Sequence, residues 1–303
     1  MEVRTQAAGI SVLCNLLLVG LKLAVGIMIA SVSVISEAIH SGLDLLAALI
    51  ALFSVRTSSR PPDERHQYGH GKIENVSGTV EAILILVAAI WIMAEAWEKI
   101  VNKAPVEAVG WGLAVMGVSS AVNLVLALYL LQVARKTHSI ALEADALHHL
   151  TDVYTSVGVF VGLGVIHFTG WNIVDPLAAI GVALLIIKTA FDLTRRAFMP
   201  LIDEALPAEE EEKIRNVLDG YQEKGELAGY HKLRTRQAGA DRYVDVHVVL
   251  PGNYDLSTAH ALSDRIEASI HDCLENTSVV IHMEPCCNQQ ERNCDSCQEM
   301  AKR

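Results

Sequence analysis

Six long apolar stretches in the first 200 residues constrain the fold of this chain more than any other feature. They lie near residues 7–30, 33–54, 77–98, 109–134, 141–168 and 174–198. Each is long enough to cross a bilayer, because a helix rises about 1.5 Å per residue through about 30 Å of hydrocarbon. Backbone polar groups in lipid must be satisfied within their own segment, which favours helices. The sequence therefore predicts an α-helical membrane protein with six transmembrane helices.

The distribution of basic residues predicts the orientation of these helices. The links after the first and fifth stretches carry no Lys or Arg. The links after the second and fourth stretches and the end of the sixth stretch are basic. The basic residues there are Arg56, Arg60, Arg65, Lys72, Arg135, Lys136, Arg195 and Arg196. The first stretch lacks a cleavage pattern, which favours a retained helix over a signal peptide. By the positive-inside rule, both termini face the cytoplasm of a multi-pass protein in the cytoplasmic membrane.

The remaining third of the chain is polar and predicts a second domain of the α+β class. Pro207 followed by acidic residues begins a helix that runs to about Glu223. Alternating patterns predict strands, a helix follows, and a last strand ends the domain. These elements lie at about 229–237, 242–250, 257–274 and 278–283. The order α-β-β-α-β predicts a ferredoxin-like domain with a three-stranded sheet.

Three parts therefore follow one another along the chain. We expect a transmembrane transport domain over residues 1–206, a cytoplasmic metal-binding domain over 207–285, and a Cys-rich tail over 286–303. The net charge is −11, and residues 201–303 hold 20 acidic and 11 basic residues. An acidic surface of this kind argues against a nucleic-acid partner, which needs a basic surface. It suits a surface that attracts cations.

A repeated motif inside two apolar stretches carries the main chemical signal. His40 and Asp44 recur as His148 and Asp152, each pair preceded by an acidic residue and Ala. Residues at i and i+4 share one helix face, and ionisable groups at this depth need partners. Two imidazoles and two carboxylates form a tetrahedral set that suits Zn²⁺. The alternative is a His–Asp hydrogen-bond network that only ties the two helices together.

Other polar residues near these stretches receive structural interpretations. His149, next to the second motif, faces another way and is interpreted as structural or interfacial. Asn123 is interpreted as a bridge between helices, without a part in transport.

Two further groups outside the apolar stretches have ligand chemistry. Asp63, His66 and His70 lie within eight residues of one another in the polar link after the second stretch. The link is either a metal site or a solvated loop. The second group lies in the predicted α+β domain, where His282 and Glu284 share one strand face. Its members are His231, His247, His260, His282 and Glu284, and the alternative is that they are ordinary surface residues.

The cysteines form a cluster near the end of the chain. Cys286 and Cys287 are followed by Cys294 and Cys297, which have the C-x-x-C spacing of half a thiolate zinc site. In a reducing cytoplasm, such a cluster indicates a metal or thiol site more than a disulfide framework. Metal capture and redox chemistry stay open as its uses.

Together these motifs resemble the cation diffusion facilitator family, over nearly the whole chain. The paired H-x-x-x-D motifs match the transport-site signature of the family. The segment from Asp63 through His70 to Lys72 and Glu74 matches the one that leads into its third helix. The tail histidines fall where the family has cytoplasmic zinc sites. His40 in the first ligand position is similar to the zinc-transporting, prokaryotic branch.

The resemblance implies a homodimer in a lipid bilayer that exports Zn²⁺ in exchange for protons. It implies that His40, Asp44, His148 and Asp152 form the transport site. It also implies that Lys72 and Asp203 form a charge interlock near the dimer interface. Zinc is then both the substrate and a structural or regulatory ion of the cytoplasmic domain, with Cd²⁺, Co²⁺ and Fe²⁺ as alternative substrates.

Two features depart from the family pattern. Glu284 stands where similar members often have Asp, and the Cys-rich tail is not part of the usual pattern. A long His-rich loop between the fourth and fifth helices, common in eukaryotic vesicular members, is absent, which favours a prokaryotic cytoplasmic membrane.

We expect alternating access around the four-ligand site, in which metal and protons compete because ligands must lose protons to bind metal. The chain has no phosphate-binding loop of the G-x-x-x-x-G-K-[ST] kind, so nucleotide hydrolysis is not expected to supply the energy. A membrane zinc sensor and a membrane metalloenzyme are the alternatives. The enzyme is disfavoured because H-E-x-x-H is missing and four protein ligands close the site.

Overall fold

The computed structural model describes residues 2–28, 32–102, 110–169 and 174–286. Within the helices it also leaves some side chains undescribed, that of His40 among them. The chain divides into two compact units, Met1–Leu201 and Ile202–Arg303, which are considered separately below.

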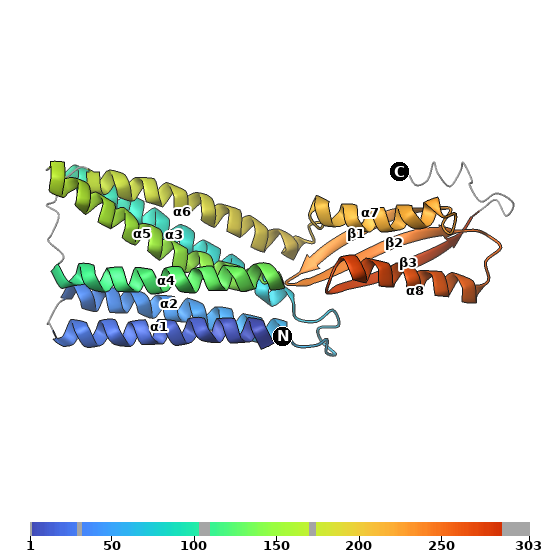
Figure 1. Cartoon of the computed structure of the whole chain (residues 1–303), viewed down its shortest axis with the longest axis horizontal. Coiled ribbons are helices and arrows are strands. Elements are labelled where there is room, and N and C mark those ends of the chain that lie inside the picture. Colours follow the sequence, from blue (N-terminus) through green and yellow to red (C-terminus); the bar gives the residue numbers. More distant parts are fainter. Residues whose placement is uncertain (1, 29–31, 103–109, 170–173, 287–303) are drawn as a thin grey trace. The chain divides into compact units, whose positions relative to one another are not determined.

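The first unit consists of six long helices, which confirms the predicted membrane fold (Figure 1). They are α1 (Glu2–Met28), α2 (Val32–Ser58), α3 (Lys72–Asn102), α4 (Gly110–Thr137), α5 (Ile140–Thr169) and α6 (Val174–Phe198). Most run a few residues beyond the predicted apolar stretches, because polar residues complete the terminal turns. A short 3-10 helix, Met199–Ile202, follows α6.

Five of these helices are long and apolar enough to cross a membrane, judged on the described residues. The exception is α5, whose first half carries five ionisable side chains. They are Glu143, Asp145, His148, His149 and Asp152. α5 was predicted from the length of its apolar stretch, and residues 153–169 of the helix carry no Asp, Glu, Lys or Arg.

Small residues allow the helices to approach closely. One apolar cluster joins α1, α2, α4 and α5 through residues such as Ala7, Ala134 and Leu142, all of them buried. A second cluster joins α3, α5 and α6 through residues such as Ala82 and Ala190. α5 belongs to both clusters and is therefore the helix that connects the two groups.

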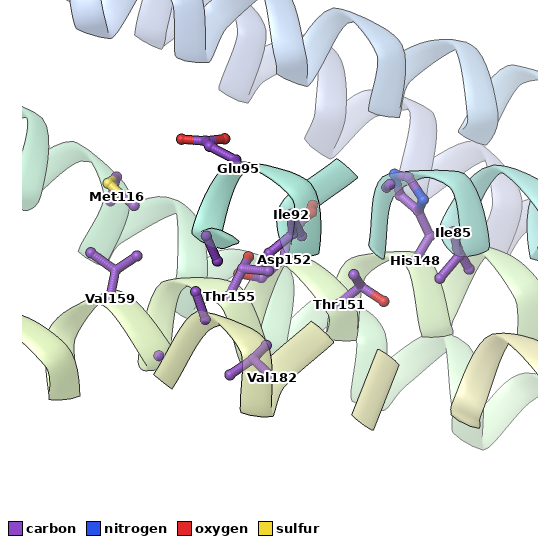
Figure 2. Close-up of a pocket in the computed structure, with 14 residues that line it drawn as sticks. Ile85, Ile92, Glu95, Met116, His148, Thr151, Asp152, Thr155, Val159 and Val182 are labelled. Atoms are coloured by element: carbon purple, nitrogen blue, oxygen red, sulfur yellow. The ribbon is translucent and has the colours of Figure 1, made fainter. Parts of the chain in front are cut away.

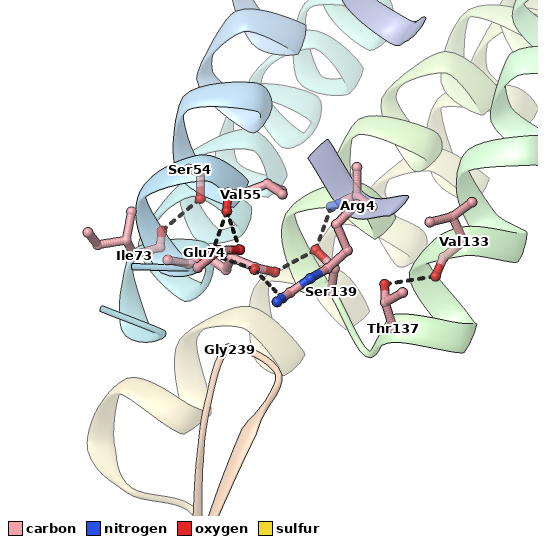
Figure 3. A network of polar contacts seen from close by, with 12 residues as sticks. Arg4, Ser54, Val55, Ile73, Glu74, Val133, Thr137, Ser139 and Gly239 are labelled. Carbon is pink, nitrogen blue, oxygen red and sulfur yellow. Dashed lines mark hydrogen bonds and ion pairs between the residues drawn. The ribbon is translucent and has the colours of Figure 1, made fainter. Parts of the chain in front are cut away.

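A buried ionic cluster closes the end of the bundle where α1, α3 and α5 begin and α2 ends (Figure 3). We call this end the loop end, because the link between α2 and α3 lies there. Glu74 of α3 is fully buried, and Arg4 Nη1 of α1 donates to its Oε1 at 2.9 Å. Ser58 Oγ of α2 donates to the same oxygen at 2.7 Å, and Ser139 Oγ donates to Oε2 at 2.5 Å. One carboxylate thus ties α3 to three other segments.

The second unit has the predicted order of elements and the predicted three-stranded sheet. Its elements are α7 (Ala208–Glu223), β1 (Gly229–Ala238), β2 (Asp241–Leu250), α8 (Leu256–Cys273) and β3 (Thr277–Pro285). The strand order is β1-β2-β3, with β1 antiparallel and β3 parallel to β2. Val244, Val246 and Val248 point from β2 into a core that includes the apolar side chains of α7 and α8. The helices therefore cover one face of the sheet, and the opposite face carries the polar residues of β2.

A β-bulge in β1 determines which side chains reach that polar face. His231 pairs with His247 and Arg234 pairs with Asp245, so two residues of β1 oppose one of β2. Lys232, inside the bulge, has a positive φ of 51°. Because of the extra residue, His231 and Arg234 lie on the same face although they are three positions apart.

Candidate metal centres

The first candidate centre lies inside the helix bundle, where α2 meets α5. His148 Nε2 lies 3.1 Å from Asp44 Oδ1. Asp44, His148 and Asp152 each offer a ligand atom, and these atoms all lie within 4.8 Å of one another. Asp44 is 4% exposed, so its carboxylate is removed from water. The structure thus brings together three of the four residues predicted for the transport site.

The fourth predicted ligand is His40, whose side chain lies outside the described part of the structure. Its backbone belongs to α2, one turn before Asp44. Residues four apart share a helix face, so this placement is the one that the spacing predicts. Its role as a ligand stays a prediction.

Asn123 of α4 is a site residue that the sequence did not reveal. Its Nδ2 donates to Asp152 Oδ2 at 3.3 Å, and Asn123 is 6% exposed. The sequence indicated a bridge between helices, and the bridge ends on a candidate ligand. A hydrogen bond of this kind fixes the orientation of a metal-binding carboxylate. A single amide in an apolar stretch gives no sign of its partner 29 residues away.

A cavity of about 370 Å³ opens beside this centre. His148 and Asp152 lie on its wall, together with Ile92 and Glu95 of α3 and Val159 of α5 (Figure 2). From His148 the cavity follows α3 and α5 towards their far ends, away from the loop end. The Glu74 cluster lies at the loop end, and neither Arg4 nor Glu74 is among the residues that line this cavity.

The second candidate centre lies in the link between α2 and α3. His66 Nδ1 is 3.2 Å from Asp63 Oδ1, and His70 Nε2 is 3.4 Å from Asp63 Oδ2. The three residues have ligand atoms within 4.8 Å of one another. The backbone amide of His66 donates to Asp63, and this bond is the main reason that the pKa of the Asp63 carboxyl is lowered. The backbone amides of Arg65 and His66 both donate to this carboxylate, so its orientation in the link is fixed.

The third candidate centre lies on the polar face of the sheet. His231, His247 and His282 form a row across β1, β2 and β3, because each is the register partner of the next. The ring centroids are 5.3 Å apart for His231 and His247 and 4.5 Å apart for His247 and His282. Three imidazoles from three strands therefore face one small area.

Glu284 completes this third centre. Its Oε1 is 2.7 Å from His247 Nδ1 and 3.7 Å from His282 Nε2, and its Oε2 is 3.4 Å from His231 Nε2. His231, His247 and Glu284 have ligand atoms within 4.8 Å of one another. The hydrogen bond with His247 is the main cause that lowers the pKa of the Glu284 carboxyl. A carboxylate with the length of Glu thus reaches all three rings.

His260, also predicted as a ligand, has a different position. It lies on α8, is largely exposed, and its Nδ1 is 3.1 Å from Asp264 Oδ1 on the same helix. The helices cover the face of the sheet opposite to the histidine row. Among the described residues, the group in this unit whose ligand atoms could share one metal is His231, His247 and Glu284, and it includes neither His260 nor His282.

The remaining predicted site residues are those of the Cys-rich tail and of the charge interlock, and some of them lie outside the residues that the structure describes. Cys286 is buried against Ala228 and Val249, and Cys287, Cys294 and Cys297 lie outside the described residues. Lys72 Nζ donates to the Leu201 carbonyl at 3.4 Å, and Asp203 Oδ1 lies 3.7 Å from Arg236 Nη1. Lys72 and Asp203 belong to different units, so their interlock stays a prediction.

Known protein families match both units of the chain. A model described as the cation efflux transmembrane domain matches residues 8–202, and one described as the cation efflux protein cytoplasmic domain matches residues 206–286. The chain belongs to the cation diffusion facilitator family. It is a multi-pass membrane protein of a family of metal cation efflux transporters, as the sequence resemblance implied.

Relatives in this family align with most of the chain. An uncharacterized transporter of Synechocystis, sll1263, is 34% identical over 278 residues, which are 92% of this chain and 89% of that protein. The cation-efflux pump FieF of Klebsiella pneumoniae is 32% identical over 255 residues, which are 84% of each chain. A solved metal-bound C-terminal domain of the CzcD transporter from Thermotoga maritima is 22% identical. That match covers 26% of this chain and 91% of that chain, with a TM-score of 0.25.

Proposed function

We propose that this cation diffusion facilitator exports Zn²⁺ in exchange for protons, with His40, Asp44, His148 and Asp152 as its transport site. The observation that carries the proposal is the convergence of Asp44, His148 and Asp152 within 4.8 Å. With the imidazole of His40 the set would hold two nitrogen and two oxygen ligands, which suits tetrahedral Zn²⁺. An all-oxygen set would instead favour Mg²⁺, Ca²⁺ or Mn²⁺.

Protons are the counter-ion that this ligand set favours. Metal binding requires deprotonated ligands, so each bound Zn²⁺ displaces protons and each arriving proton weakens metal binding. Moving two positive charges outwards against about 100 mV requires about 4.6 kcal/mol, at about 2.3 kcal/mol per charge. An inward proton flow through the same protein supplies that energy.

Two features of the bundle support a mechanism of alternating access. We infer that the cavity beside His148 and Asp152 gives access from the side away from the loop end, because its lining residues run along α3 and α5 in that direction. The Glu74 cluster holds the loop end closed. We infer that the termini lie in the cytoplasm, as the basic residues predict, so that this conformation faces outwards. Release of the Glu74 contacts would then accompany opening to the cytoplasm.

The second unit is proposed to bind Zn²⁺ as a regulatory or structural ion and to form a homodimer. Its centre at His231, His247, His282 and Glu284 has three nitrogen ligands and one carboxylate, again a zinc-like set. The unit is acidic, so bound Zn²⁺ reduces repulsion between two copies. We expect zinc to raise the melting temperature of the unit. The double variant His247→Ala/His282→Ala should remove that gain and leave the bundle site intact.

The deciding experiment is metal uptake into proteoliposomes under an imposed pH gradient, with Zn²⁺, Cd²⁺, Co²⁺ and Fe²⁺ compared. We expect Zn²⁺ uptake that depends on the gradient and is absent from Asp152→Ala. A protein that binds zinc without flux would instead be a membrane zinc sensor. Hydrolysis of a substrate without flux would indicate the metalloenzyme.

A further inference from the structure

Two acidic side chains inside the bundle take no part in the metal centre described above. Glu81 of α3 is 1% exposed and Asp145 of α5 is 0% exposed. Among the described residues, none of their four carboxylate oxygens has a hydrogen-bond partner. An ionised carboxylate without donors is strongly unfavourable in a protein interior, and more so at membrane depth. The bundle must therefore neutralise these two groups in another way.

The two acids occupy the same level of neighbouring helices. α3 and α5 both begin at the loop end, so they run in the same direction. A Cβ at Gly78 of α3 would lie 3.3 Å from Ile140 of α5, and Ala82 and Ala144 share one apolar cluster further along. Glu81 and Asp145 are next to these two alanines in the sequence. They interact electrostatically with each other, and Glu81 also interacts with His148.

The surroundings of the pair supply few groups that could stabilise two negative charges. Ser77 lies one turn before Glu81, and its Oγ is buried. Among the described residues it has no hydrogen-bond partner within 3.5 Å, and its interaction with Glu81 is of longer range. His149 Nε2 is 3.6 Å from Asp145 Oδ1, which is longer than a hydrogen bond but within ion-pair distance if the imidazole carries a proton. The same nitrogen lies 3.4 Å from both Ser11 Oγ and Asn15 Nδ2 of α1.

The other elements around the pair contribute mainly apolar side chains. α6 contributes Ile186, Ala190 and Leu193, and α4 contributes Leu130 and Val133 to the cluster beside Asp145. Asp44 of α2 contacts His148. Among the residues that the structure describes, the titratable groups that interact with the two acids are each other, His148 and His149.

We propose that Glu81 and Asp145 form a proton-binding pair that is separate from the metal ligands and carries protons in the exchange cycle. The inference rests on the metal and proton exchange proposed above. A carboxyl group that holds a proton is neutral, which removes the penalty of burying its charge. A proton also needs no coordination space, and neither acid is among the residues that line the cavity beside His148.

Electrostatics couples this pair to the metal centre without a shared ligand. Asp145 lies three residues before His148 and therefore on the same side of α5. A divalent cation at His148 favours the ionised form of nearby carboxyl groups. The O–H bond of the acid then breaks, the carboxylate keeps the electron pair, and the proton passes to water. Protonation of the pair reverses the effect and weakens metal binding.

The test measures protons released when Zn²⁺ binds the purified full-length protein in weakly buffered detergent solution. Glu81→Gln and Asp145→Asn keep the side-chain shape and remove the proton-binding group. Glu98→Gln is the matched control, because Glu98 is an exposed acid on the same helix. We expect both buried variants to bind Zn²⁺ yet release fewer protons per Zn²⁺ than the wild type and the control. Glu81→Asp and Asp145→Glu, which keep an acid, should restore the release if the amide variants fold poorly.

The outcomes separate this inference from the proposed function. Unchanged proton release in Glu81→Gln and Asp145→Asn, with Zn²⁺ binding intact, would overturn the proton-binding pair and leave metal and proton exchange standing. A wild-type protein that binds Zn²⁺ without releasing protons would overturn the exchange itself.

Discussion

His148 Nε2 lies 3.1 Å from Asp44 Oδ1, and this contact joins α5 to α2 across 104 residues of sequence. The candidate transport site therefore depends on how two separate helices pack. Any motion that moves α5 relative to α2 changes the distance between ligands, and so changes metal affinity. A site shared between helices is suited to alternate between binding and release.

Removal of either carboxylate should abolish transport. Asp44→Ala and Asp152→Ala each leave too few ligands for a tetrahedral ion, so we expect no Zn²⁺ flux above that of empty liposomes. Asp192→Ala, at an exposed acid of α6, is the control and should transport normally. Size-exclusion profiles would verify folding. Wild-type flux from Asp44→Ala or Asp152→Ala would refute the site assignment.

Loss of the Asn123 amide should weaken metal binding without removing a ligand. Asn123→Ala removes one contact that orients the Asp152 carboxylate, and loss of such a supporting hydrogen bond typically lowers metal affinity about 10- to 100-fold. Calorimetric titration with Zn²⁺ measures the effect. Ser119→Ala, one turn earlier on α4, is the matched control and should keep the wild-type affinity.

Substitution of the imidazole at position 40 should change selectivity. His40→Asp gives an oxygen-rich set, which we expect to broaden transport towards Cd²⁺ and other divalent cations. The measurement is the ratio of Zn²⁺ to Cd²⁺ uptake rates in proteoliposomes. An unchanged ratio would mean that His40 does not determine selectivity.

The Glu74 cluster should contribute strongly to the stability of the bundle. Glu74→Ala leaves Arg4 largely buried without its carboxylate, a change that typically lowers the free energy of unfolding by about 3–5 kcal/mol. We expect a lower melting temperature in detergent. The double variant Arg4→Ala/Glu74→Ala should be less destabilised than the two single effects combined, because it leaves no unpaired charge. Simple additivity would show that the pair does not interact.

The Glu284 carboxylate of the third candidate centre should make the thermal stability of the second unit depend on pH. The pKa of Glu284 is lowered in the folded unit, so its stabilising effect is present above the ordinary carboxyl value of 4.5 and is lost as pH falls through the lowered pKa. Without metal, Glu284→Gln should therefore melt below the wild type at neutral pH, and the difference should shrink in acid. Glu275→Gln, at an exposed acid of the same unit, should show no such trend. Thermal melting of residues 202–286 at several pH values measures this.

Patterns local in the sequence predicted the fold well. The apolar lengths predicted all six helices, and the alternation of Val and polar residues in β2 predicted its two faces. The bulge at Lys232 was not predicted, because no residue type there favours a positive φ. It matters because it brings His231 into register with His247.

The repeated His-x-x-x-Asp spacing placed four candidate ligands together in the bundle, and the structure brings three of them, Asp44, His148 and Asp152, within 4.8 Å of one another. Spacing within one helix does not predict contacts between segments that are far apart in the sequence. Glu74 is acidic and begins a helix, a common arrangement, and nothing nearby in the sequence indicates Arg4 as its partner. His260 was predicted to join the strand histidines. The sequence did not show that α8, which carries His260, covers the opposite face of the sheet.

The polar first half of α5 also has a consequence for how the protein enters the membrane. A central Asp opposes insertion of an isolated helix by roughly 2.5–3.5 kcal/mol, and α5 carries Asp152 towards its middle. The helix is therefore poorly suited to partition into lipid alone during synthesis. It packs against α4, which precedes it directly and is apolar enough to span by itself. The two helices should enter the bilayer together as a hairpin, so that the residues needed for transport make α5 dependent on its neighbour for biogenesis.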